Sequence, residues 1–194
     1  MPRKFPYLLF GIIIILITGS CVDRSYVPKP HGFFRIDLPQ KQYVVFDSIY
    51  PFRFETPVYS RVIEIEKDTF ESNKINIEYS NYKATLHLTY LPLKNNLDLY
   101  ITDTYKYVDK HIPKASNIDE KLYTNDLSKV YGLTFKIEGS GVASPFQFFV
   151  TDSIQHFLRG ALYFKMAPKN DSLKPVIDFI SSDINHMINT LSWK

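Results

Sequence analysis

A single cysteine, Cys21, stands directly after a short leader, and it constrains the chain before any fold is considered. Two basic residues open the leader, residues 5–17 form an apolar run with five isoleucines, and Gly19 and Ser20 precede the cysteine. This order is typical of a bacterial secretory signal that ends in a lipidation site. We therefore expect residues 1–20 to be a cleaved signal peptide and the Cys21 thiol to carry a lipid.

Two other interpretations of the leader stay open. An uncleaved membrane helix needs about 20 apolar residues, whereas this run is shorter and is interrupted by Pro6 and Gly11. Ordinary signal cleavage would leave Cys21 as a free thiol. In each case, a lone cysteine excludes an internal disulfide framework and a multi-cysteine zinc site.

The body behind the leader is long enough for one domain with its own core. The leader holds 20 of the 194 residues and two of the 23 basic side chains, which leaves 174 residues with 21 basic against 20 acidic side chains. This balance, without a basic stripe, argues against a nucleic-acid partner. The 14 tyrosines and 15 phenylalanines, against 7 glycines, favour aromatic-rich strands.

The first residues of the mature chain predict a tether. Pro28 and Pro30 favour extended polyproline geometry over residues 21–31, the lipidated amino terminus. Ten such residues reach roughly 30 Å. We expect a single domain over residues 32–194.

The first half of the domain predicts short strands. Residues 33–38 and 43–46 look extended, and residues 52–55, between Pro51 and Pro57, suit an edge strand. Three further segments alternate apolar and polar residues with the period of a strand that is buried on one face. They are residues 62–66, 75–79 and 84–90.

A helix is predicted next, capped by Asn95 or Asn96, running to about His111 and stopped by Pro113. Its apolar residues recur at spacings of three and four, which gives one buried stripe. They are Leu97, Ile101, Tyr105 and Val108.

The second half predicts strands followed by the clearest helix of the chain. The strands cover residues 121–123, 130–138, 146–151 and 157–165, the last two forming a hairpin. Asp171 or Ser172 caps the helix, and Pro175 suits its first turn. One helix face is apolar: Val176, Ile177, Ile180, Ile184, Met187, Ile188 and Leu191. The order of elements predicts an α+β fold, a single domain with an antiparallel sheet, flanking helices and a long C-terminal helix.

No pattern in the sequence predicts catalysis, a metal or a cofactor. The five histidines form no HExxH motif, and His87 should face outward because Leu86 and Leu88 face inward. The stretch 139–141 is a Gly-Ser-Gly turn and lacks the GxSxG pattern of a nucleophile elbow. Asp152, Ser153 and His156 lie in one turn, where hydrogen-bonded turn chemistry is favoured over a triad.

The hairpin at residues 146–165 offers a candidate partner surface, because polar residues lie among its aromatic ones. Its members are Gln147, Asp152, His156 and Arg159. The alternative is a packed core sheet whose polar residues only close turns. Arg159 stands apart, since an arginine between Leu158 and Gly160 needs a carboxylate or water as its partner.

Four stretches along most of the mature chain resemble the gliding-motility lipoprotein GldD family of the Bacteroidota. They are residues 28–39 (PKPHGFFRIDLP), 143–148 (ASPFQF), 156–164 (HFLRGALYF) and 171–180 (DSLKPVIDFI). From the family, only the lipid-bearing position is carried over, to Cys21, and no catalytic residue is. By element order alone, the predicted fold is also similar to the Mog1/PsbP type.

The resemblance implies a lipid-anchored, non-enzymatic assembly or scaffold component of the gliding-motility and type IX secretion machinery. Its implied partners are the membrane, other envelope lipoproteins, and periplasmic ring or motor proteins. The alternative function is an envelope module that binds or hydrolyses lipid or glycan. The stretch 22–24 lacks the acidic run associated with surface display in this phylum, so we expect a periplasm-facing protein at the outer membrane.

Overall fold

The computed structural model divides the chain into two units, Met1–Phe33 and Phe34–Lys194. It describes residues 36–65, 73–166 and 169–194, all in the second unit. The predicted signal peptide, Cys21 and the tether lie outside the described residues.

The body contains strands, two α-helices and two single turns of 3₁₀-helix, at Ser80–Tyr82 and Ile112–Lys114. The α-helices are α2 (Leu97–Asp109) and α3 (Asn170–Thr190). The strands are β1 (Tyr43–Asp47), β2 (Phe52–Pro57), β3 (Arg61–Ile65), β4 (Asn73–Tyr79), β5 (Ala84–Pro92), β6 (Asn117–Asn125), β7 (Val130–Glu138), β8 (Phe146–Thr151), β9 (His156–Phe164) and β10 (Ser192–Trp193).

The strands form two antiparallel sheets. The larger has seven strands in the order β3-β4-β5-β9-β8-β7-β6, and the smaller has three in the order β1-β2-β10. The centre of the larger sheet joins two distant parts of the chain, because β5 pairs with β9 from Ala84↔Phe164 to Pro92↔His156. The predicted α+β fold with an antiparallel sheet is therefore confirmed.

The larger sheet is covered on two faces by different cores. In β8, Phe148 and Val150 point into a large core, while Phe149 points into a smaller one on the other face. This follows from the two-residue period of a strand, and it makes β8 buried throughout. The large core lies between the sheet, α3 and β2, and the smaller core lies under α2.

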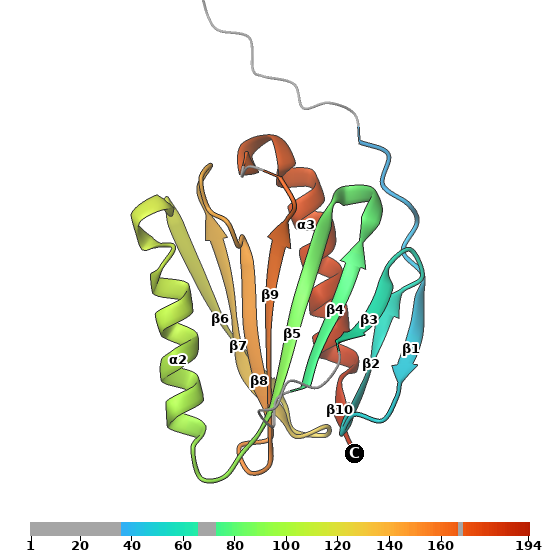
Figure 1. The fold of residues 1–194 in the computed structure, drawn as a ribbon, viewed down its shortest axis with the longest axis vertical. Helices are drawn as coiled ribbons and strands as arrows, with labels where there is room; N and C mark the ends of the chain where they lie inside the picture. Colours follow the sequence, from blue (N-terminus) through green and yellow to red (C-terminus); the bar gives the residue numbers. More distant parts are fainter. Residues whose placement is uncertain (1–35, 66–72, 167–168) are drawn as a thin grey trace, which may run out of the picture. The chain divides into compact units, whose positions relative to one another are not determined.

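Both helices turn their predicted apolar stripes toward these cores. Figure 1 shows α3 behind the sheet and α2 on the β6 side. The four stripe residues predicted for α2 pack in the smaller core, and the seven predicted for α3 are buried. Pro175 lies five residues after the first residue of α3, so it is not in the first turn as predicted. Asn96 is the N-cap residue of α2, one of the two predicted alternatives, although its side chain makes no capping hydrogen bond. The N-cap residue of α3 is Lys169 and not the predicted Asp171 or Ser172.

The smaller sheet departs from prediction. The strand at residues 52–57 is central and not an edge, because β1 and β10 pair with its two sides. Pro51 precedes it and Pro57 ends it, so neither missing N–H group interrupts the ladder. The two-residue strand β10 was not predicted, and described residues 36–42 form no strand. They run alongside the body without strand pairing.

A close approach at the centre of the sheet generates the first prediction. A Cβ added to Gly160 would overlap the Phe148 ring, whereas one added to Gly141 would meet Lys114 Cδ at 3.5 Å, an ordinary contact. Overpacking of this kind costs about 1–3 kcal/mol. We expect Gly160→Ala to lower the free energy of unfolding by that amount, measured by urea unfolding of the full chain through the fluorescence of Trp193. Gly141→Ala is the control; equal effects of the two substitutions would contradict the packing.

Candidate functional site

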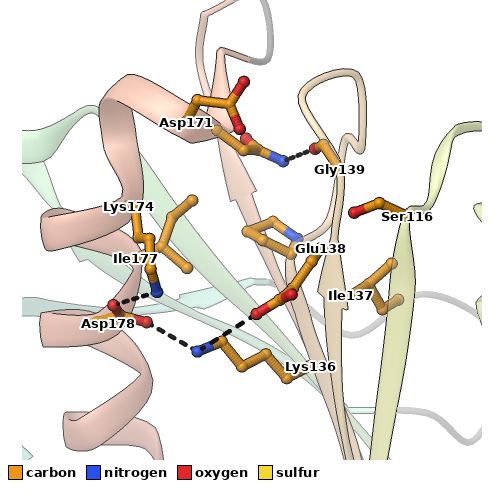
Figure 2. Close-up of a pocket in the computed structure, with 11 residues that line it drawn as sticks. Ser116, Lys136, Ile137, Glu138, Gly139, Asp171, Lys174, Ile177 and Asp178 are labelled. Atoms are coloured by element: carbon orange, nitrogen blue, oxygen red, sulfur yellow. Dashed lines mark hydrogen bonds and ion pairs between the residues drawn. The ribbon is translucent and has the colours of Figure 1, made fainter. Parts of the chain in front are cut away.

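A polar pocket of about 180 Å³ lies between the end of β7 and the first turns of α3 (Figure 2). Most of the residues that line it are charged or polar. They include Lys136, Glu138, Asn170, Asp171, Lys174 and Asp178. The pocket is open to solvent, so a small ligand could reach it.

Asn170 fixes the upper rim of the pocket. Its side-chain Nδ2 donates to the carbonyl oxygens of Gly139 and Val142, both at 2.9 Å. Gly139 has a φ of 141°, a conformation that side chains disfavour. The buried amide therefore holds the turn after β7 against the start of α3, and its role is structural.

The floor of the pocket is an ionic network around Asp178. Lys136 Nζ lies 3.0 Å from Asp178 Oδ1, and Lys174 Nζ lies 2.8 Å from Asp178 Oδ2. Burial acts to raise the pKa of Asp178, but the hydrogen bonds from Lys174 and Lys136 outweigh it and the pKa is lowered. The hydrogen bond to Asp178 raises the pKa of Lys174. Lys174 is thus held charged, and both lysines are engaged by Asp178.

A second hollow of about 280 Å³ lies across the Lys136–Asp178 ion pair, toward β6. Among its lining residues, Ser181 Oγ is buried without a hydrogen-bond partner. Neither hollow brings a nucleophile and a base together through the interactions just described. Within the described ranges, no group of three or more His, Cys, Asp or Glu residues could hold a metal ion. The geometry suits polar contact and offers no evident chemistry.

A buried carboxylate on α3 forms the most connected cluster of the body. Asp183 is 1% exposed. Lys41 Nζ and the Tyr43 hydroxyl donate to its Oδ1 at 2.7 Å and 2.9 Å, and the Tyr59 hydroxyl donates to its Oδ2 at 2.8 Å. Burial, followed by the hydrogen bond to Asp183, raises the pKa of both tyrosines far above the usual value.

This cluster docks the amino-terminal part of the body on α3. Lys41 Nζ also donates to the Phe179 carbonyl oxygen at 3.0 Å. The Tyr43 ring stacks on His186 with centroids 3.7 Å apart, and His186 Nε2 lies 2.6 Å from Glu55 Oε2. Residues more than 120 positions apart in the chain are thereby held together.

The sequence analysis missed Asp183, although a signal was present. Asp183 follows Ile180 by three positions and precedes Met187 by four, so it falls on the apolar face of the helix. A charged residue on such a face is almost never fully buried without a partner. That position alone could have marked it as a paired buried carboxylate.

Two predicted partner-surface residues, Asp152 and His156, occupy the β8–β9 turn. Asp152 Oδ1 accepts backbone N–H groups from Ile154, Gln155 and His156 at 2.8–3.0 Å. Burial acts to raise the pKa of Asp152, but these donors outweigh it and the pKa is lowered. His156 Nδ1 lies 2.9 Å from the Tyr90 hydroxyl, and its ring stacks on Trp193. Turn chemistry and ring packing account for these contacts.

The other two, Gln147 and Arg159, lie on the opposite face of the sheet, on the α2 side. Gln147 is buried, and its Nε2 has no hydrogen-bond partner. Arg159 is half-buried, with its guanidinium 4.0 Å from the centroid of Tyr107. Asp152 and His156 therefore lie on one face of the sheet, and Gln147 and Arg159 lie on the other. His87 is exposed, is hydrogen-bonded to Asn76 and faces outward as predicted.

The fold is an α+β body, and the solution structure of PsbP from the cyanobacterium Synechocystis sp. PCC 6803 is similar to it at a TM-score of 0.47 and 8% identity, covering 81% of this chain and 95% of that chain. At this TM-score, the likeness adds no argument about function. No curated protein matches the chain.

The model of the gliding motility lipoprotein GldD family matches residues 23–193, so the chain belongs to that family. It is a lipoprotein of the cell envelope that takes part in gliding motility. Neither α-helix of the described body is long and apolar enough to cross a membrane.

The buried cluster generates the second prediction. Loss of a buried charged acceptor costs about 1.5–3 kcal/mol, and Lys41, whose side chain is 32% exposed, can turn to water when that charge is removed. We expect Asp183→Asn to lower the free energy of unfolding on that scale in urea titrations. Asp178→Asn is the matched control, because exposed pairs contribute about 0–1 kcal/mol. A loss at Asp183 no larger than the loss at Asp178 would contradict the cluster's role.

Proposed function

We propose that the protein is a lipid-anchored, non-enzymatic assembly or scaffold component of the gliding-motility and type IX secretion machinery. The observation that carries this proposal is the family match over residues 23–193. Its partners are then the membrane, other envelope lipoproteins, and the periplasmic ring or motor proteins of that machinery. No nucleic acid is among them, and no cofactor is required.

The anchor in this proposal is Cys21. Residues 1–20 are the signal peptide, residues 21–31 the lipidated amino terminus and tether, and residues 32–194 the single domain. Burial of acyl chains contributes about 0.8 kcal/mol per CH₂ group, so several chains attach the protein stably. The body then sits close to its membrane, facing the periplasm at the outer membrane.

The non-enzymatic part of the proposal is supported by how the polar residues are used. An envelope hydrolase or ligand-binding module would need Asp152, His156 and Arg159 to converge on an apolar pocket. Instead, Asp152 is saturated by turn N–H groups, His156 packs on Trp193, and Arg159 points from the other face. This alternative therefore gains no support from the geometry.

Deletion of the gene tests the function. We expect the deletion strain to lose colony spreading and secretion of type IX cargo, because both processes depend on one assembly. Spreading is measured on agar and cargo by analysis of the culture medium, with the wild-type gene returned in trans as the control. Normal spreading and normal cargo secretion in the deletion strain would refute the proposal.

A substitution at Cys21 tests anchoring and orientation. We expect Cys21→Ala to abolish palmitate labelling and to leave the protein without its lipid, because this thiol is the only one in the chain. In the wild type, external protease on intact cells should leave the protein uncut, whereas protease on lysed cells should cut it. Persistent labelling of the variant would contradict the anchor, and cleavage on intact cells would contradict the orientation.

A further inference from the structure

Half of one face of the larger sheet is left without a helix. The smaller core places α2 over β7, β8 and β9 and reaches Leu91 at the end of β5, and no helix of the described body covers β4 on the same face (Figure 1). The outward side chains here include His87 and Tyr163, whose rings meet edge to face. Within the described chain, this half is therefore an accessible, flat surface beside α2.

Positive charge gathers on this open face. Arg61 and Lys165 both contact Glu78, at 3.2 Å and 3.3 Å. Arg159 and Lys110 add two more cations beside α2. Lys74, on β4, has an interaction of its own. Among the described residues just named, four cations lie on or beside this face against the one carboxylate of Glu78, so cations are in excess.

Arg159 is the centre of this excess. The described residues give it neither a carboxylate partner nor a hydrogen-bond acceptor, although a guanidinium carries five N–H donors. Its contact is the Tyr107 ring, and Lys110 Nζ lies 4.8 Å from the same ring centroid. Two cations on one ring repel each other, and a bound anion would offset that repulsion.

The separation of the cations indicates the size of an anion that could contact all of them. Arg61 lies in register with Glu78, Thr85 and Tyr163 on the next three strands. Arg159 lies four residues before Tyr163 on β9, and β9 is three strands away from β3. With strands about 4.8 Å apart and a rise of about 3.3 Å per residue, the two arginines are separated by about 20 Å. That is the length of about six extended residues.

We propose that this face, defined by Arg61, Lys110, Arg159, Lys165 and the ring of Tyr107, docks an acidic polypeptide segment of a partner protein. Charge complementarity selects an acidic occupant, and the separation of the arginines selects a chain over a small ion. A planar bilayer is disfavoured because Arg159 lies against the side of α2, on the ring of Tyr107 in the last turn of that helix. A peptide can enter this angle between helix and sheet.

The proposal is tested with fluorescein-labelled poly-L-glutamate and the full-length lipidated protein in neutral detergent micelles. We expect Arg159→Gln combined with Lys110→Gln to weaken binding by about tenfold, because two of the face's charges are removed. The control is Arg53→Gln combined with Lys121→Gln, which removes the same residue types from β2 and β6. Fluorescence anisotropy measures affinity, and urea unfolding of each variant confirms folding.

The outcomes decide between the occupants. Equal losses in the two double variants would overturn the proposal, because the charges would then act only as net charge. Displacement of the probe by micelles that contain phosphatidylglycerol, at matched negative charge, would assign the face to anionic lipid and overturn the acidic-peptide proposal. A wild-type protein that does not bind the probe at low salt would do the same.

This inference rests on the proposed assembly role, since it names the chemistry of one partner, but it can fail separately. If gene deletion leaves spreading and secretion intact while probe binding still depends on Arg159, the assembly role fails and the surface stands. If deletion abolishes both processes and the face variant restores them fully, the assembly role stands and the surface fails.

Discussion

The structure depends on one buried carboxylate, Asp183, more than on any other polar group. A carboxylate in an apolar core is stable only when its oxygens are occupied, and Lys41, Tyr43 and Tyr59 occupy them. Lys41 and Tyr43 come from β1 and the residues before it, a segment with little apolar surface to bury on α3, and Tyr59 comes from the turn between β2 and β3. The small sheet is therefore joined to the body by a combination of ring packing and one shared charge.

The two faces of the larger sheet have different uses. The face under α3 is closed by the small sheet and is saturated with aromatic contacts, so its role is stability. The opposite face is only half closed, and the surplus of cations lies on its open half. This asymmetry leaves one half of the sheet accessible to a partner.

Local patterns predicted nearly all the elements, whereas pairing and burial of charge came from the structure. Alternation along residues 84–90 and the spacing of Ile180, Ile184 and Met187 each depend on neighbours in sequence, so they could be read directly. The pairing of β5 with β9 joins segments about seventy positions apart, and no local signal specifies it. Arg159 was predicted to need a carboxylate or water as its partner, whereas its contact is the ring of Tyr107 on α2.

The position of Lys41 and Tyr43 has a mechanical consequence. Both precede or begin β1, at the amino-terminal side of the described body, and both are fastened to the carboxylate in the middle of α3. A pull that reaches the body from that side would be carried first by these two side chains and only then by the strand ladder of β1 and β2. The contacts of Lys41 and Tyr43 with Asp183 would therefore take up the load before the hydrogen bonds between β1 and β2 do.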